Sequence, residues 1–345
     1  MRNSAETSPG GSAAAWYGSH ADVLGIGVWT ESRAGQGEDA EPLLAHHVPT
    51  GTGIVGVFDG LGGSGAALEY RSGNGTPRSG AWTGSRVAKI AVESWFRATL
   101  DGTPGNTPSL DEHIAATFTL KRPVTRSKLV GTMRMNLPTT MAAIRYERSG
   151  DQVECTALWA GDSRAYTLQP WGGMHALTRD HTVETDALEQ LNQDPPMTNV
   201  LCAGKEFVLD SHTVRVTLPA VLVCATDGFF GYVDTPAHFE FHLLDTLARA
   251  WDGRDWARRL AERVVSYTGD DASLSLVGFG YRSLDQLRDS FAPRTRDVTT
   301  SYPWPVPPDV NADDGLRRQW CALAWHKYQP EYERLMPALP EEPVR

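Results

Sequence analysis

The sequence lacks the features that mark several common classes of protein. No apolar run approaches the roughly 18 residues that a membrane-spanning helix needs. The first fifteen residues, MRNSAETSPGGSAAA, have no apolar core for a signal peptide and are typical of a disordered lead. The four cysteines show neither CxxC spacing nor a dense framework, and the formal net charge is -10 at pH 7. We therefore expect a soluble, cytoplasmic protein that binds neither nucleic acid nor membrane.

What the sequence does contain is enough apolar residues for a core, in a pattern dominated by strands. Of 345 residues, 41% are hydrophobic. Short β-branched or alternating runs bounded by Gly, Asp or Pro predict strands at 22–30, 53–59, 139–146, 153–160, 164–168, 213–218, 220–226 and 273–279. Helical spacing of apolar residues occurs at 85–100, 238–250 and 255–268. Runs of strands interrupted by a few helices predict sheets packed on each other with helices outside.

The character of the chain changes after about residue 282, which divides it into a main domain (16–282) and an extension (283–345). The stretch SYPWPVPP (301–308) is proline-rich. Its PxxP is interpreted as an extended connector, with a ligand for a recognition domain as the alternative. A capped amphipathic helix is predicted at 313–328, with an apolar stripe of Leu316, Trp320, Leu323 and Ala324. Because aromatic residues are costly to leave in water, we expect the extension to pack on the domain as an ordered strap. The alternative is a docking helix for a partner such as a kinase.

One strand ends in an unusual way. In GIVGVFDGLGG (53–63) an apolar run is followed by Asp59 and then by glycines. The stretch formally matches GxGxxG, but no acidic residue lies between Glu69 and Glu93 to bind a ribose, and Asp59 would face the pyrophosphate. No Gly-Lys-Ser/Thr follows, so the stretch is not a P-loop either. A carboxylate at this position suits a cation.

Other acidic residues occupy similar positions along the chain. Asp227 also follows a buried apolar run and precedes a glycine, and further acids stand near strand ends at Asp39, Asp162, Asp270 and Asp271. A single aspartate in such a place is usually a turn residue or a cap. Together, carboxylates without paired cysteines indicate hard-oxygen coordination of Mg²⁺ or Mn²⁺.

The order of these residues resembles that of the PP2C-type (PPM) metal-dependent serine/threonine protein phosphatases, over roughly residues 20–280. Seven motifs occur in the family's order: Arg33 with Glu38-Asp39-Ala40, VFDGLGG (57–63), PTTMAA (138–143), GDSRAY (161–166), LTRDHT (177–182), CATDGFFGYV (224–233) and DDAS (270–273). The resemblance implies an α+β fold, a four-layer α-β-β-α sandwich of two antiparallel sheets flanked by helices. Leu61 stands where many eukaryotic members carry a histidine, and an apolar residue there is similar to the bacterial branch.

The resemblance also implies an activity and a set of site residues. It implies hydrolysis of phosphoserine and phosphothreonine on proteins by direct attack of a metal-activated water, with a Ser/Thr kinase substrate as the partner. Two Mn²⁺ or Mg²⁺ ions would be bridged by Asp59, and a third, weaker ion would bind Asp162. The first ion would bind Asp227 and Asp270, with Asp271 as the fallback. The second would bind Asp39 and the Gly60 carbonyl, with Glu38 beside them, and Arg33 would clamp the phosphate.

Two other functions stay open at this stage. One is a catalytically weak or inactive regulatory module that kept the fold, and the other is a small-molecule phosphoesterase. Retention of several acids favours the enzyme, because carboxylates that repel each other without metal are of no use to a scaffold. His181, Thr139 and Thr140 are interpreted as hydrogen-bonded structural residues and not as ligands or nucleophiles. A further partner at the C-terminal extension is also considered.

Overall fold

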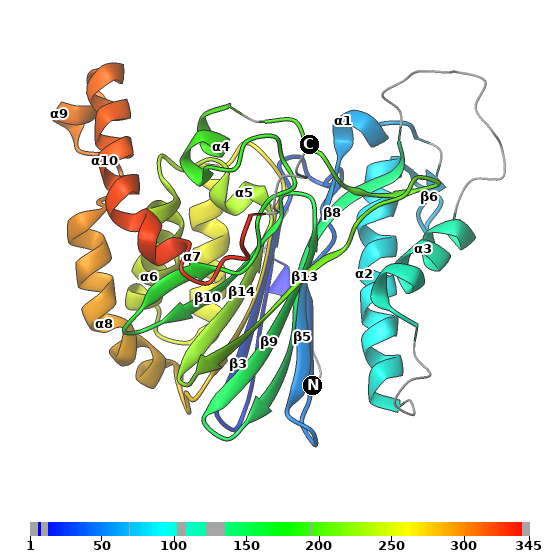
Figure 1. The fold of residues 1–345 in the computed structure, drawn as a ribbon, viewed down its shortest axis with the longest axis horizontal. Coiled ribbons are helices and arrows are strands. Elements are labelled where there is room, and N and C mark those ends of the chain that lie inside the picture. Colours follow the sequence, from blue (N-terminus) through cyan, green and yellow to red (C-terminus); the bar gives the residue numbers. More distant parts are fainter. Residues whose placement is uncertain are drawn as a thin grey trace, which may run out of the picture.

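Two antiparallel sheets lie face to face at the centre of the protein, and helices cover both outer faces (Figure 1). The computed structural model describes residues 6–7, 13–68, 70–101, 108–121, 135–193 and 195–339. In the described part of the chain, no helix has the length and apolar character to cross a membrane. The arrangement confirms the predicted four-layer α+β sandwich.

The strand order places segments that are far apart in the sequence next to each other in the sheets. The first sheet has the order β1 (Glu6–Thr7), β2 (Ala13–His20), β3 (Val23–Thr30), β15 (Ala272–Phe279), β14 (Ala220–Ala225), β10 (Arg164–Gln169) and β11 (Gly173–Ala176). The second has the order β13 (Asp210–Thr217), β9 (Gln152–Ala160), β8 (Asn136–Ser149), β5 (Thr52–Gly60) and β4 (Leu43–His47), with β12 (Leu201–Ala203) paired to β8. A short hairpin of β6 (Tyr70–Arg71) and β7 (Pro77–Arg78) lies apart.

Buried side chains fill the spaces between the four layers. Successive residues of β5 point to opposite faces, so Ile54 lies in the outer cluster under the helices and Val55 in the cluster between the sheets. Helices α2 (Gly80–Asp101) and α3 (Leu110–Lys121) cover this outer face. Since both faces of β5 are covered, the strand is apolar throughout. This is why Asp59, its penultimate residue, stands out in the sequence.

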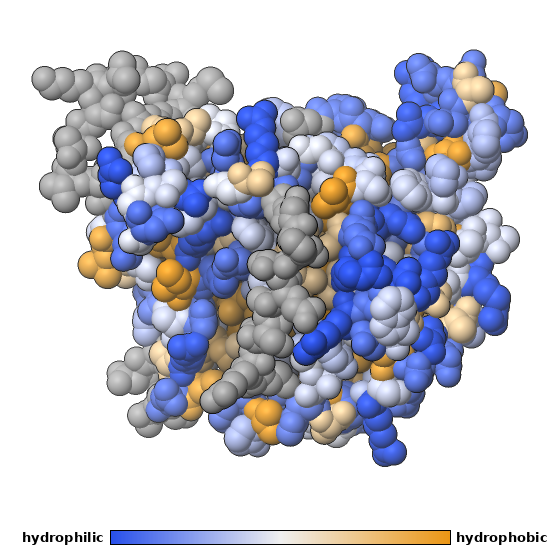
Figure 2. Space-filling view, turned by 180° about the vertical axis from the view of Figure 1, so that it is seen from behind, coloured by the Kyte–Doolittle hydropathy of each residue, from blue (hydrophilic) through white to orange (hydrophobic). Residues whose placement is uncertain are grey.

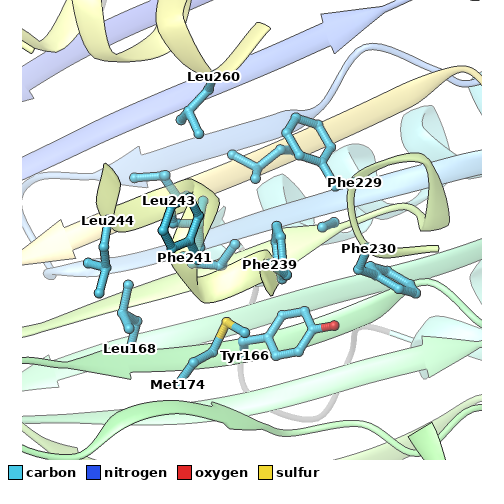
Figure 3. Close-up of a cluster of buried hydrophobic side chains, with 14 of the residues drawn as sticks. Tyr166, Leu168, Met174, Phe229, Phe230, Phe239, Phe241, Leu243, Leu244 and Leu260 are labelled. Atoms are coloured by element: carbon cyan, nitrogen blue, oxygen red, sulfur yellow. The ribbon is translucent and has the colours of Figure 1, made fainter. Parts of the chain in front are cut away.

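The outer face of the first sheet carries the largest cluster, under α6 (Pro236–Arg249) and α7 (Gly253–Val265). Figure 3 shows side chains of β10 and β11 meeting those of α6. The rings of Tyr166 and Phe239 lie 5.4 Å apart by their centroids. On the face seen in Figure 2, hydrophilic residues predominate and apolar ones are scattered, as is usual for a folded domain.

All eight predicted strands and all four predicted helices are present, with ends that differ by a few residues. The predicted lead of residues 1–15 lies mostly outside the described residues. Glu6–Thr7 and Ala13–Ala15 are nevertheless paired in the first sheet, so the lead does not extend to residue 15. The sequence also did not predict α8 (Leu284–Ser301), whose buried Leu284, Leu287, Phe291 and Val298 recur among many polar residues.

The C-terminal extension packs on the domain, as predicted for a strap. It consists of α8, α9 (Pro308–Asn311) and α10 (Asp314–Tyr332), and α10 contacts α6 and β11. The predicted apolar stripe of α10 is confirmed for Ala324 and for Trp320, which is partly buried against the core, but it is wrong for Leu316 and Leu323, which are 52% and 64% exposed. The buried face instead carries larger rings and small residues, namely Cys321, Ala324, Trp325, Tyr328 and Tyr332. The aromatic rings determine which face of α10 is buried, because they bury the most apolar area.

A buried ion-pair network fastens the extension to α6. Glu240 of α6 is fully buried and accepts hydrogen bonds from Arg294 of α8 at 2.7 and 2.8 Å. The Tyr328 hydroxyl of α10 donates to the same carboxylate at 2.7 Å, and Arg294 also donates to Glu331 at 2.8 Å. Removing one member would leave an uncompensated buried charge, so the network holds the three helices in one arrangement.

We expect Phe291→Ala to lower the free energy of unfolding by about 3 to 5 kcal/mol, because this ring of α8 is fully buried in the cluster under α6. Chemical denaturation measures the loss. Leu323→Ala, on the exposed side of α10, is the control and should change stability by less than about 0.5 kcal/mol. If Phe291→Ala were as neutral as the control, the extension would not be part of the core.

Candidate active site

A cleft of about 1020 Å³ is lined by residues of α1 (Gly62–Gly65) and α5 (Asp227–Phe230) and by strand ends of both sheets. Figure 1 shows α1 and α5 at the same end of the two sheets. Its lining includes most of the predicted acidic residues, namely Glu38, Asp59, Asp162, Asp227, Asp270 and Asp271. Asp39 lies behind them and is only 2% exposed. The structure therefore brings together acids that are more than 200 residues apart in the sequence.

Each carboxylate is placed by the end of a regular element. Asp59 is the penultimate residue of β5, and its carbonyl accepts a hydrogen bond of 2.5 Å from the Thr139 hydroxyl of β8. Asp227 opens α5 directly after β14, and Asp162 lies in the turn between β9 and β10. Asp270 stands two residues before the start of β15. Strand ends bring the acids to the same edge of the sandwich, which is why their positions in the sequence were informative.

Burial and mutual repulsion raise the pKa of these acids. Loss of hydration is the largest cause for Asp39, Asp59 and Asp227, and it raises the pKa of each well above its usual range. The negative charges of neighbouring aspartates, including Asp162 and Asp270, raise the pKa of Asp59 and Asp227 further. The carboxyl groups of Asp39 and Asp59 also interact directly. Such a cluster is stabilised by a proton or by a cation.

Two glycines beside the acids are required by close packing of backbone. A Cβ at Gly60 would lie 2.6 Å from the carbonyl oxygen of Glu38, and one at Gly228 would lie 2.0 Å from that of Asp271. Both distances are far below van der Waals contact. The Asp-Gly pattern noticed in the sequence therefore has a packing cause, which holds whether or not the Gly60 carbonyl also binds an ion.

The two adjacent acids Asp270 and Asp271 have different surroundings. One Asp271 oxygen accepts from the backbone and hydroxyl of Ser32 at 2.8 and 3.1 Å, and the other accepts from the Glu38 backbone at 2.6 Å. Asp271 thus holds the loop before β4. Asp270 is exposed at the cleft, and its charge raises the pKa of Asp59 and Asp227. Both oxygens of Asp271 are therefore engaged with the loop that carries Glu38, whereas Asp270 lies exposed at the mouth of the cleft.

The structure does not bring Arg33 into the lining of the cleft. Its side chain is exposed on the 31–37 loop, which is fastened by hydrogen bonds from the backbones of Gly35 and Gly37 to Glu31. Among the described lining residues the cations are Arg164 and Lys205, neither of which was proposed from the sequence. Arg164 stood within the GDSRAY motif as a signal, whereas nothing in the sequence marked Lys205.

The histidine and threonines interpreted as structural do have structural partners. His181 Nδ1 accepts from the Gly161 backbone at 3.1 Å, and Nε2 hydrogen-bonds Asp210 at 2.9 Å. The Thr140 hydroxyl pairs with that of Ser163 at 2.7 Å. These bonds fix the turn that carries Asp162.

The donor set fits divalent ions that prefer oxygen. The acids around the cleft are carboxylates, they are partly or fully desolvated, and each raises the proton affinity of others. Within the described ranges, no three His, Cys, Asp or Glu side chains are arranged to hold one ion between them. The site is therefore a ring of carboxylates around a cleft and not a closed cage.

No model of a known protein family and no curated protein matches the sequence. Among solved structures, the PPM Ser-Thr phosphatase MsPP from Mycobacterium smegmatis, in complex with cacodylate, is 19% identical and has a TM-score of 0.51, covering 74% of this chain and 98% of its own. The serine/threonine phosphatase Stp1 from Staphylococcus aureus is 16% identical with a TM-score of 0.52, covering 76% and 96%. A bacterial serine phosphatase is 15% identical with a TM-score of 0.52, covering 76% and 99%. At these identities the likeness shows the fold.

We expect Asp59→Asn to stabilise the metal-free protein by about 1 kcal/mol at pH 8, because one of the repelling carboxylates is removed. A raised folded pKa favours the folded state below the ordinary carboxylate range, and this advantage is lost as the pH rises through the raised value. The gain in the variant should therefore shrink toward pH 5. Thermal unfolding across this pH range, with and without Mn²⁺, measures it.

Asp180→Asn is the control, because removing this carboxylate should destabilise the protein where removing that of Asp59 stabilises it. Asp180 is buried and paired with Arg164 at 2.8 Å, so its loss should lower the free energy of unfolding by about 3 to 5 kcal/mol.

Mn²⁺ should raise the unfolding temperature of the wild type but hardly that of Asp59→Asn. An unchanged metal response in Asp59→Asn would contradict the assignment of Asp59 to the metal centre.

Proposed function

We propose that this protein, which has the fold of the bacterial PPM phosphatases, is a divalent-metal-dependent phosphatase that acts on phosphoserine and phosphothreonine in proteins. The observation that carries the proposal is the group of carboxylates at the strand ends of one cleft, in which Asp59 and Asp227 have lost hydration and face further negative charges. Keeping these carboxylates close together without a cation costs stability. A scaffold or regulatory module would have no use for that cost, so we favour an enzyme.

The residues that would hold the ions are the acidic residues around the cleft and one backbone carbonyl. In this proposal Asp59, Asp227 and Asp270 would hold a first ion, and Asp59, Asp39 and the Gly60 carbonyl would hold a second, with Glu38 beside them. Binding would have to draw these carboxylates closer together than they lie in the metal-free protein, where no three of the described side chains enclose one ion. Asp162 would hold a third, weaker ion. When bound, Mn²⁺ or Mg²⁺ supplies a water nucleophile at neutral pH and neutralises the phosphoryl oxygens.

The protein's own groups orient this arrangement. The Thr226 hydroxyl donates to Asp39 at 2.9 Å, and Thr139 fixes the backbone of Asp59. Leu61 lines the cleft directly after Gly60 and has no proton to donate. Leu61 cannot be the general acid, so in this proposal the leaving group takes its proton from water or leaves unaided. We therefore expect phosphate esters of acidic alcohols, such as phenols, to react faster than those of serine.

The cleft suits a phosphorylated side chain on a polypeptide. It is wide for a small phosphate ester, and the segment 195–206, including Lys205, contributes to its lining beyond the acids. A small-molecule phosphoesterase is the second candidate, and comparing phosphopeptides with small phosphate esters separates the two. A phosphopeptide substrate implies a Ser/Thr kinase as the source of the phosphate.

We expect Mn²⁺ or Mg²⁺ to be required for hydrolysis of phosphothreonine peptides and of an aryl phosphate, with activity abolished by a chelator and restored by metal. Asp227→Asn should lower kcat by about two orders of magnitude or more, because a ligand of the first ion is lost. Asp285→Asn is the control, since Asp285 pairs with Arg288 on α8 and lies outside the cleft lining. Full activity of Asp227→Asn, or of the chelated enzyme, would refute the proposal.

The phosphate-binding cation is tested by comparing two variants. Arg33→Ala should raise KM if the 31–37 loop places this side chain over the bound phosphate. Lys205→Ala should raise KM instead if the cation that lines the cleft does so. In either case we expect a change of about threefold to tenfold in KM, with a smaller loss in kcat than for Asp227→Asn. Equal, unchanged kinetics in both variants would exclude both residues as the clamp.

A further inference from the structure

We propose that Trp325 and Tyr332, on the C-terminal helix α10, are positioning residues for the substrate side of the cleft. They hold Arg164 and the segment 180–193, which contribute to the same cleft lining as the acids. The inference rests on the proposed phosphatase function and concerns residues beyond the expected phosphatase core.

Arg164 is the point at which several parts of the cleft are joined. Its guanidinium donates to Asp180 at 2.8 to 3.1 Å and to Gln190 at 2.7 Å, and it stacks on Phe230 with the Cζ atom 4.2 Å from the ring centroid. Asp180, Gln190 and Phe230 all line the cleft. Phe230 belongs to α5, which begins at Asp227. The position of the Arg164 side chain thus fixes the segment 180–190 relative to the carboxylates of the cleft.

Tyr332 supports Arg164 from the side of the extension. Its hydroxyl accepts a hydrogen bond of 3.3 Å from Arg164 Nη1, and its ring packs against Tyr166 with centroids 6.0 Å apart. The side chain is almost fully buried. Tyr332 therefore occupies the remaining side of the guanidinium, which is already bound by Asp180 and Gln190.

Trp325, two turns earlier on α10, holds the middle of the segment. Its indole Nε1 donates to one oxygen of Asp186 at 2.9 Å. The other Asp186 oxygen accepts from the backbones of Leu188 and Glu189 at 2.9 and 3.0 Å and so caps α4 (Ala187–Gln193). Trp325 thereby fixes the start of α4, the helix that carries Gln190 to Arg164.

The same helix has a second set of contacts that does not reach the cleft. Tyr328 lies between Trp325 and Tyr332, and its hydroxyl binds Glu240 in the network with Arg294. Removing the Tyr328 hydroxyl disturbs the anchoring of α10 on α6. It leaves every hydrogen bond to Arg164 and Asp186 intact, so Tyr328→Phe separates general stability from positioning.

The test compares Trp325→Phe and Tyr332→Phe with Tyr328→Phe in the full-length protein. Each change removes one hydrogen-bonding group and keeps an aromatic ring. We expect Trp325→Phe and Tyr332→Phe to raise KM for a phosphothreonine peptide by about threefold to tenfold, while kcat on a small aryl phosphate changes by less than about twofold. Tyr328→Phe should leave both values unchanged, even where its unfolding temperature falls by the same amount.

Amide hydrogen exchange of the metal-free protein gives a readout that does not depend on activity. We expect faster exchange within 181–193 in Trp325→Phe but not in Tyr328→Phe. A wild-type protein without phosphatase activity would refute the proposed function, and exchange alone would then decide whether α10 positions the segment. An active wild type with Trp325→Phe indistinguishable from Tyr328→Phe in exchange and in peptide KM would overturn the inference.

Discussion

Repulsion among carboxylates that strand ends bring into one cleft is the constraint on which the rest of the structure depends. Desolvation and neighbouring charge both oppose ionisation of Asp59 and Asp227. The scaffold holds them nonetheless, through nine- and six-residue strands buried on both faces and through backbone packed at Gly60 and Gly228 too tightly for a side chain. The close packing that makes the sandwich rigid therefore also keeps the carboxylates of the cleft together.

The parts that could be predicted from the sequence are those decided locally. A strand covered on both faces is apolar throughout, so β5 and β14 and the acids at their ends could be recognised from a single chain. The seven motifs in order then predicted the fold. The buried face of α10 and the existence of α8 could not be predicted in this way, because both depend on which surface of α6 they meet. For the same reason the sequence did not show that Arg164 lines the cleft and Arg33 does not, since the partners of an arginine side chain are set by the tertiary structure.

The C-terminal extension joins two kinds of contact on one helix. Toward α6 and α8, Tyr328 takes part in a buried network with Glu240 and Arg294 that fixes where the helix lies. Toward the cleft, neighbouring residues of the same helix contact Arg164 and the cap of α4. A helix anchored firmly on one side can place groups accurately on the other. The outer layer of the sandwich is thereby connected to the cleft without contributing any of the acids.

The contact between Asp271 and Ser32 spans 239 positions of the chain, and β15 pairs with β3 along its whole length. During synthesis, the first strand of the central pairing therefore leaves the ribosome long before its partner exists. The loop that carries Glu38 and Asp39 acquires its final shape only when residue 271 arrives. The acidic cleft is thus assembled last, after almost all of the domain has been made, and a truncated chain cannot contain it.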